Sequence, residues 1–305
     1  VGVAVIDSGI SAHPNVASRV VYRESFIAGS KLDDYGHGTH VAGIVAGSVK
    51  NSDVKGVAPG VNLIDLRVLD ANGMSSDSVI IAALDRAVQL RSKYNIRVIN
   101  LSLGRPVFES YKSDPLVKAV EAAWKKGIIV VVASGNLGRS GYSTILSPAN
   151  SPAVITVGAM KTADTQGKGD DTIASYSSKG PSWGDLVVKP DLVAPGNLIV
   201  GLRTPGSKLD LEYPGNVVNA NYTRMSGTSM AAPMVSGAAA LMVGREPGLT
   251  PDTVKARLMK TASKRFPTAS VTVDKGAVYP AVYDMFTVGA GYLDVAAAVA
   301  SNDKP

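Results

Sequence analysis

The sequence predicts an α/β fold, a three-layer sandwich in which helices cover both faces of a mainly parallel central sheet. Short runs rich in Val and Ile alternate along the chain with longer stretches of helical pattern. Within the short runs, apolar residues occupy consecutive positions, which is typical of strands buried on both faces. Strands of this kind, separated by helices, are joined by right-handed crossovers into a parallel sheet.

The alternation of patterns places each element along the chain. The strands are expected at residues 1–6, 62–69, 97–102, 128–133, 154–159 and 197–202. The helices are expected at 37–48, 76–94, 113–126, 229–243, from 250 onward and at 294–300. Residues 161–190 and 203–224 are predicted to be long polar loops. Because no internal repeat, low-complexity tract or linker divides the chain, we expect a single domain over residues 1–305.

Periodicity and end signals support the individual helices. The second helix has one apolar face, formed by Ile80, Ala83, Leu84 and Ala87 at spacings of i, i+3, i+4 and i+7. The third begins with Asp114 and Pro115 and stops at Gly127, which are favoured residues at these positions. The stretch 229–243 is apolar all round, which predicts a buried central helix.

Composition excludes several classes of protein. Hydrophobic residues make up 45% of the chain and charged residues 18%, a combination that excludes intrinsic disorder. With no Cys, the chain has no disulfide, no Cys-ligated metal and no thiol nucleophile. The net charge of +6 comes from scattered residues, so we expect no nucleic-acid partner. The longest apolar stretch, 230–243, is too short and interrupted to span a membrane, so no membrane partner is expected.

Two candidate functional residues stand at junctions, one at the end of a predicted strand and one at the start of a predicted helix. Asp7 directly follows the first strand, at the edge of the sheet where open α/β folds bind ligands. His37 opens a helix in the run Gly-His-Gly-Thr-His. Asp7 could instead cap a turn, and His37 could face solvent or bind zinc with His40. Zinc is a weak alternative, since there is no HExxH motif and a third ligand would have to come from His13 or a carboxylate.

Two further candidates lie later in the chain. Ser229 stands at the start of a predicted helix, among small residues that would let an acyl group reach its hydroxyl. Pro233 is expected in the first turn of that helix, where its missing N–H costs little. Asn136 follows a core strand and could aim its side-chain amide at a developing oxyanion. The plainer interpretations are an N-cap for Ser229 and a turn for Asn136.

Taken together, these stretches resemble a subtilisin-like serine protease, a subtilase, whose triad follows the chain order Asp, His, Ser. The resemblance depends on residues 5–10 (VIDSGI), 37–43 (HGTHVAG) and 227–233 (GTSMAAP). Further stretches in the family's order are 100–104 (NLSLG), 134–136 (SGN), 193–196 (VAPG) and 289–294 (GAGYLD). They run from near the first residue to near the last, and no triad position departs from the pattern.

The resemblance implies a role for each candidate residue in peptide-bond hydrolysis. Ser229 would attack the scissile carbonyl, His37 would take its proton and return it to the leaving amine, and Asp7 would orient the imidazole. Asn136 and the backbone N–H of Ser229 would form the oxyanion hole. An extended substrate would be flanked by Gly73, Met74, Ser75, Ser102, Leu103 and Gly104. The pocket for the residue before the cut would also be lined by Ala133, Ser134 and Gly135.

The residues around this pocket predict its preference. Both walls are small or apolar, and no carboxylate among them would hold a basic side chain. We therefore expect cleavage after Phe, Leu, Met or Tyr and poor cleavage after Lys or Arg. Leu137 stands at the rim, where many subtilases have an acidic residue. Leu146 is expected near the base, where it would shift the preference from Phe toward Leu or Met.

The sequence therefore predicts a subtilisin-type serine endopeptidase of broad specificity, whose chemistry requires no cofactor or metal. Structural Ca²⁺ is compatible with the family but is not predicted, because the loop 48–55 carries two lysines and the loop 164–171 fits a solvated loop better. The expected partners are polypeptide substrates in extended conformation and a cleaved propeptide, with the enzyme a monomer. Secretion is expected from the resemblance, although the sequence opens on a strand with no signal-peptide pattern.

Other classes of protein fit the sequence less well. A dinucleotide-binding enzyme would need G-x-G-x-x-G after the first strand, and a P-loop enzyme would need G-x-x-x-x-G-K-[ST]; neither motif is present. A catalytically inactive subtilase that only binds peptides differs from an active one in turnover, which a peptide-cleavage assay measures.

Overall fold

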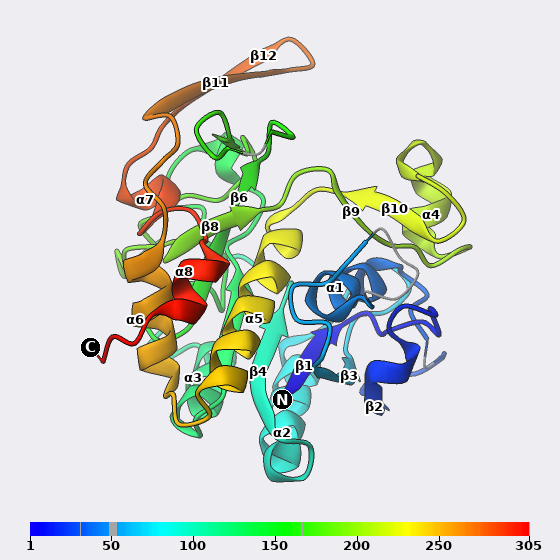
Figure 1. Cartoon of the computed structure of the whole chain (residues 1–305). Helices are drawn as coiled ribbons and strands as arrows, with labels where there is room; N and C mark the ends of the chain where they lie inside the picture. Colours follow the sequence, from blue (N-terminus) through cyan, green and yellow to red (C-terminus); the bar gives the residue numbers. More distant parts are fainter. Residues whose placement is uncertain (31, 49–53, 166, 305) are drawn as a thin grey trace.

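The computed structural model describes residues 1–30, 32–48, 54–165 and 167–304 and has the three layers expected from the sequence (Figure 1). The central sheet has the strand order β2-β3-β1-β4-β5-β6-β7, and β8 also pairs with β6. Its strands are β1 (Gly2–Asp7), β2 (Val20–Ser25), β3 (Asn62–Arg67), β4 (Ile96–Leu101), β5 (Ile129–Ala133), β6 (Ile155–Lys161), β7 (Thr172–Ile173) and β8 (Leu192–Pro195). Only β7 among them pairs antiparallel, with β6.

The longer helices pack against this sheet, as the buried strands require. The longer ones are α1 (His37–Ala46), α2 (Asp77–Tyr94), α3 (Pro115–Lys125), α5 (Thr228–Arg245) and α6 (Pro251–Thr261). The shorter ones are α4 (Lys208–Glu212), α7 (Met285–Val288) and α8 (Val295–Ala300). α2 packs on α3 and α1 packs on α5, and each pair contacts the strands (Figure 1). Every residue of β1 and of β5 is buried, which explains their consecutive apolar residues.

The strand order creates a binding edge at the centre of the sheet. The chain adds β3 to one side of β1 and later adds β4 to the other side. The topological switch point therefore lies between β1 and β4, where open α/β sheets bind ligands beyond the carboxyl ends of the strands. Asp7 is the last residue of β1, and Ser102 directly follows β4. Two of the candidate residues are thus neighbours across this crevice.

The predicted strand at 197–202 exists, but it does not belong to the central sheet. The segment forms β9 (Ile199–Leu202), which pairs antiparallel with β10 (Tyr222–Met225) outside the central sheet. β10 and α4 both begin in the stretch 203–224 that was predicted to be a loop. A short Ile/Val run predicts a strand, but it does not show which distant segment will pair with that strand. The polar strand Tyr-Thr-Arg-Met gives little local signal of its own.

A second two-stranded sheet also went unpredicted. β11 (Ala269–Asp274) and β12 (Ala277–Val282) form an antiparallel hairpin that projects from the body of the molecule (Figure 1). Val271, Val273 and Val278 on this hairpin are exposed. Among the described helices, none combines the length and apolar character needed to cross a bilayer.

Candidate active site

A cleft of about 790 Å³ brings together residues from distant parts of the chain. His37, Asn136 and Ser229 line it. So do six of the residues predicted to flank a substrate: Gly73, Met74, Ser75, Ser102, Leu103 and Gly104. Ala133, Ser134 and Gly135 are not among the residues that line this cleft. Ala133 and Ser134 are buried at the end of β5.

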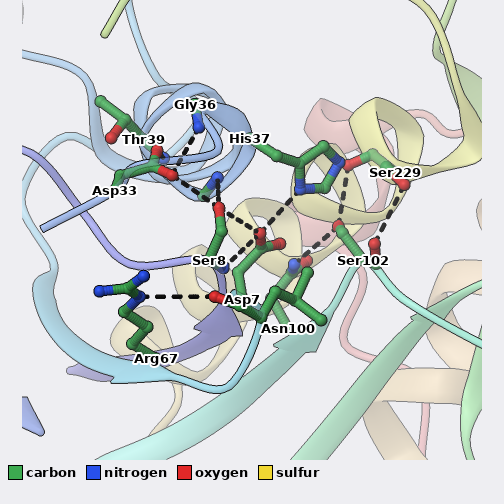
Figure 2. Close-up of polar contacts among 12 residues, drawn as sticks. Asp7, Ser8, Asp33, Gly36, His37, Thr39, Arg67, Asn100, Ser102 and Ser229 are labelled. Carbon is green, nitrogen blue, oxygen red and sulfur yellow. Dashed lines mark hydrogen bonds and ion pairs between the residues drawn. The ribbon is translucent and has the colours of Figure 1, made fainter. Parts of the chain in front are cut away.

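Asp7 and His37 form a close pair, of which His37 lines the cleft. Asp7 Oδ1 accepts hydrogen bonds from His37 Nδ1 and from the backbone N–H of Ser8, both at 2.7 Å. The side chain of Asp7 is fully buried, and that of His37 is 14% exposed. A proton held on Nδ1 by the carboxylate leaves Nε2 of His37 free to accept one. Figure 2 shows the ring of His37 between Asp7 and Ser229.

The surroundings of His37 set its pKa. Burial by itself lowers the pKa of His37. The negative charge of Asp7, its hydrogen bond and the charge of Asp33 act in the opposite direction, and the net pKa of His37 lies above the ordinary 6.5. A base with a pKa in this range suits proton transfer near neutral and alkaline pH.

Buried Asp33 fixes the start of the helix that carries His37. Its carboxylate accepts hydrogen bonds from the N–H groups of Gly36 at 2.7 Å and Thr39 at 2.8 Å, and from Ser8 Oγ at 2.7 Å. Ser8 Oγ also accepts from the N–H of Gly38 at 2.8 Å (Figure 2). The first turn of α1 is therefore tied to the end of β1. Sequence reasoning missed Asp33, although an acidic residue ahead of a helix start is a recognised capping signal.

Steric constraints explain why glycine stands on either side of His37. Gly36 has φ 95° and is the N-cap of α1, a left-handed conformation that favours glycine. A Cβ at Gly36 would collide with Ser207 Oγ, and one at Gly38 would collide with the carbonyl oxygen of Gly9. Both positions therefore need glycine because another segment passes directly against the backbone.

Ser229 is the second residue of α5 and is not its N-cap, which is Gly227. Its hydroxyl donates to the carbonyl of Ser102 at 3.1 Å (Figure 2). At this position the backbone N–H of Ser229 is one of those that a helix start leaves without an intrahelical partner. The plainer interpretation of Ser229 as a helix cap is therefore wrong.

The predicted place of Pro233 is also wrong. α5 begins at Thr228, so Pro233 lies in the second turn, where the missing N–H leaves the carbonyl four residues earlier without its helical partner. That carbonyl belongs to Ser229, and it accepts a hydrogen bond from Ser102 Oγ at 2.8 Å. Asn100 Nδ2 donates to the same Ser102 Oγ at 2.9 Å. The helix tolerates Pro233 because a side chain from β4's end replaces the lost bond.

Asn136 is oriented by a residue that sequence reasoning did not single out. The side-chain oxygen of Asn136 accepts hydrogen bonds from the N–H of Thr228 at 2.9 Å and from Thr228 Oγ1 at 3.1 Å. Thr228 Oγ1 also accepts from the N–H of Gly135 at 3.2 Å. With the oxygen engaged, the amide group of Asn136 is left as a donor beside the start of α5, next to Ser229.

Leu146 occupies the space between the two predicted walls of the specificity pocket. A Cβ on Gly104 would lie 3.1 Å from Leu146 Cβ, and a Cβ on Gly135 would lie 2.7 Å from Leu146 Cγ. The N–H of Leu146 donates to the carbonyl of Ser134 at 3.1 Å. Leu137 is 46% exposed, outside this packed region. Any slot between Gly104 and Gly135 is therefore shortened by the Leu146 side chain.

The residues considered as metal ligands are engaged in other contacts. His40 is fully buried, and its Nε2 lies 3.1 Å from the carbonyl oxygen of Ile199. His13 Nε2 lies 3.0 Å from the carbonyl oxygen of Asn221. Across the described parts of the chain, His, Cys, Asp and Glu form no group of three that could hold a metal ion. Most of the loop 48–55 lies outside the described residues.

Comparisons with known proteins show the family to which the chain belongs. A model of the subtilase family matches residues 1–280. The chain is 41% identical to serine protease AprX of Bacillus subtilis (strain 168), covering 87% of this chain and 61% of AprX. It is 38% identical to subtilisin DY of Bacillus licheniformis, covering 86% of this chain and 84% of that protein. A crystal structure of a cold adapted subtilisin-like serine proteinase superposes with a TM-score of 0.65 at 31% identity, covering 86% of this chain and 82% of the other.

The family model covers most of the chain. The chain also covers more than two thirds of the length of subtilisin DY. The predicted resemblance and the predicted fold class are thereby confirmed. This chain belongs to the subtilase family, a family of serine endopeptidases.

Proposed function

We propose that this chain hydrolyses peptide bonds through Asp7, His37 and Ser229. The observation that supports it most is the 2.7 Å bond between Asp7 Oδ1 and His37 Nδ1, at a cleft that Ser229 and Asn136 also line. A buried Asp that orients a His beside a Ser hydroxyl is the arrangement that activates a serine nucleophile.

The reaction follows from the positions of these groups. The Ser229 hydroxyl turns from the carbonyl of Ser102 toward Nε2 of His37, which takes its proton as the oxygen attacks the scissile carbonyl. The resulting oxyanion is stabilised by the amide of Asn136 and the free N–H of Ser229. His37 then protonates the leaving amine. Water hydrolyses the acyl-enzyme by the same steps, and the buried charge of Asp7 stabilises the imidazolium throughout.

The same proposal includes a preference at the residue before the cut. Leu146 lies against both Gly104 and Gly135, and the predicted walls consist of small or apolar residues with no carboxylate. We therefore propose that Leu and Met are cleaved at least as well as Phe, with Tyr also accepted. Lys and Arg are cleaved poorly, because burying an unpaired charge is costly. The main chain of an extended substrate pairs with residues 73–75 and 102–104, which provides broad affinity.

Family membership supports further parts of the proposal. We propose secretion, removal of a propeptide and a monomeric enzyme, because the relatives include subtilisins of Bacillus species. The chemistry derived above uses only side chains and backbone groups of this chain, so no cofactor is needed for it.

A peptide-cleavage assay tests the proposal. Internally quenched peptides that differ only at the residue before the cut should be hydrolysed by the wild-type chain, with Leu and Met well above Lys and Arg. Ser229→Ala should abolish hydrolysis while peptide binding remains. If the wild-type chain binds these peptides without cleaving any of them, it is a binding module and the proposed activity is wrong.

A further inference from the structure

One charged side chain in the cleft is left without a counter-charge. The cleft is lined by the cations Arg105, Arg203 and Arg224 and by two Asp residues. Arg105 pairs with Asp77 at 2.8 Å, and Arg203 pairs with Asp210. Arg224 is exposed, and within the described residues its guanidinium makes no ion pair and no hydrogen bond. An exposed guanidinium of this kind is free to bind a carboxylate.

The wall that carries Arg224 lies on the side of His37. Arg224 is on β10, which pairs with β9, and β9 packs against α1, the helix that begins at His37. The segment between the two strands is bonded to the loop before His37: the N–H of Lys208 donates to the carbonyl of Asp34 at 3.0 Å. Figure 1 shows β9, β10 and α4 grouped beside α1.

This placement puts the wall that carries Arg224 beside the substrate residues that follow the cleaved bond. In the proposed reaction His37 returns its proton to the leaving amine, so the residues after the cut lie toward the His37 side. Other acidic groups of the same region are already paired. Asp34 pairs with Arg67 at 3.0 Å, and Glu212 pairs with Lys208 at 3.7 Å. Neither group pairs with Arg224 among the described residues, so its guanidinium is available to a carboxylate of the substrate.

We propose that Arg224 is a specificity-determining residue that favours an acidic side chain among the first residues after the cut. The inference rests on the proposed endopeptidase function. An exposed charge pair contributes modestly, so we expect roughly a twofold to fivefold gain in kcat/KM for Glu over Gln. Screening by salt should reduce the gain.

The test uses peptides that are identical up to the cut, with Leu before it, and carry Glu, Gln or Lys at the first two positions after it. The wild-type chain at low salt should prefer Glu over Gln and Gln over Lys. In Arg224→Gln, the Glu and Gln peptides should become equal, and Arg224→Glu should reverse the order. Arg265→Gln removes the same charge from an exposed position outside the cleft and should keep the wild-type order.

The outcomes separate this inference from the proposed function. A wild-type chain that cleaves all three peptides equally, or an Arg224→Gln variant that keeps the Glu preference, would overturn the role of Arg224 alone. Failure to cleave even the Gln peptide, which does not need Arg224, would overturn the endopeptidase function and the inference with it.

Discussion

At the scale of single residues, the amide of Asn136 depends on its contact with Thr228. Thr228→Val keeps the shape of the side chain and removes the hydroxyl that bonds the Asn136 oxygen and the N–H of Gly135. We expect kcat to fall by about fivefold with little change in KM, because a neutral hydrogen bond is worth about 1 kcal/mol. Steady-state kinetics on one peptide measure this, and Thr228→Ser should restore most of the rate.

Removing the donor itself should cost more. Asn136→Leu should lower kcat roughly 10²- to 10³-fold with KM nearly unchanged, a magnitude established for subtilisin, a relative of this chain. A rise in KM with kcat intact, in either variant, would place Asn136 in ground-state binding rather than in the oxyanion hole.

The pKa of His37 predicts the pH dependence of the rate. The active form is the neutral imidazole, so kcat/KM should fall as the pH drops through the pKa of His37. Because Asp7 and Asp33 raise this pKa, the midpoint of the rate profile should lie above 6.5. Asp33→Asn removes one of the two charges and should move the midpoint to lower pH. A wild-type midpoint at or below 6.5, or one that Asp33→Asn leaves in place, would contradict this account.

Individual residues with unusual neighbours were the easiest to predict from sequence. Asp7, His37, Asn136 and Ser229 each stand beside or close to glycine near the end of a strand or the start of a helix. In the structure His37, Asn136 and Ser229 line one cleft, and buried Asp7 bonds His37. Thr228 escaped prediction because its partners, Gly135 and Asn136, lie far away in the sequence, whereas Asp33 was missed although it bonds the nearby N–H groups of Gly36 and Thr39.

At the scale of elements, Pro233 and Ser102 form a coupled pair. Ser102→Ala leaves the carbonyl of Ser229 and the amide of Asn100 without this partner and should destabilise the fold by about 1–3 kcal/mol. Pro233→Ala supplies an N–H that can bond the same carbonyl within α5. The cost of Ser102→Ala should therefore be smaller when position 233 is Ala. Chemical denaturation in a Ser229→Ala background, which prevents self-digestion, measures both.

Strict additivity of the two substitutions would mean that Ser102 and Pro233 do not share the Ser229 carbonyl. Double-mutant cycles detect such sharing because independent sites add and coupled sites do not.

Most strands that are buried in the sheet were predictable, although the short buried strand β8 was not. Elements that depend on distant pairing were not predicted either. The runs that became β1, β3, β4, β5 and β6 are rich in buried apolar residues because helices cover both faces of the sheet. β2 lies at the edge of the sheet with a mixed sequence, and β10 exists because β9 pairs with it. The tertiary fold decides which strands pair in this way. At most one strand of each such pair was therefore predicted from the sequence.

At the scale of the whole molecule, buried His40 should make the fold sensitive to acid. Burial, with a contribution from the nearby His37, lowers the pKa of His40 from 6.5 to about 4. Between these pH values His40 is therefore protonated in the unfolded chain but neutral in the folded chain. Stability from this source is fully present above pH 6.5 and is lost as the pH falls toward 4, by about 3 kcal/mol in total.

His40→Gln gives a matched comparison, because its amide can still donate to the carbonyl of Ile199 but does not titrate. In the Ser229→Ala background, the free energy of unfolding of this variant should fall less between pH 6.5 and 4 than that of its parent. Equal losses would show that His40 titrates normally in the folded chain.

The most direct measurement of the central claim is the kcat/KM of Ser229→Ala, His37→Ala and the double variant on one peptide. If Asp7, His37 and Ser229 act as a unit, each single variant should lose roughly as much as the double variant, on the order of 10⁶-fold as in the relative subtilisin. Losses that multiply in the double variant, or a His37→Ala variant that keeps most of its activity, would contradict a shared catalytic triad.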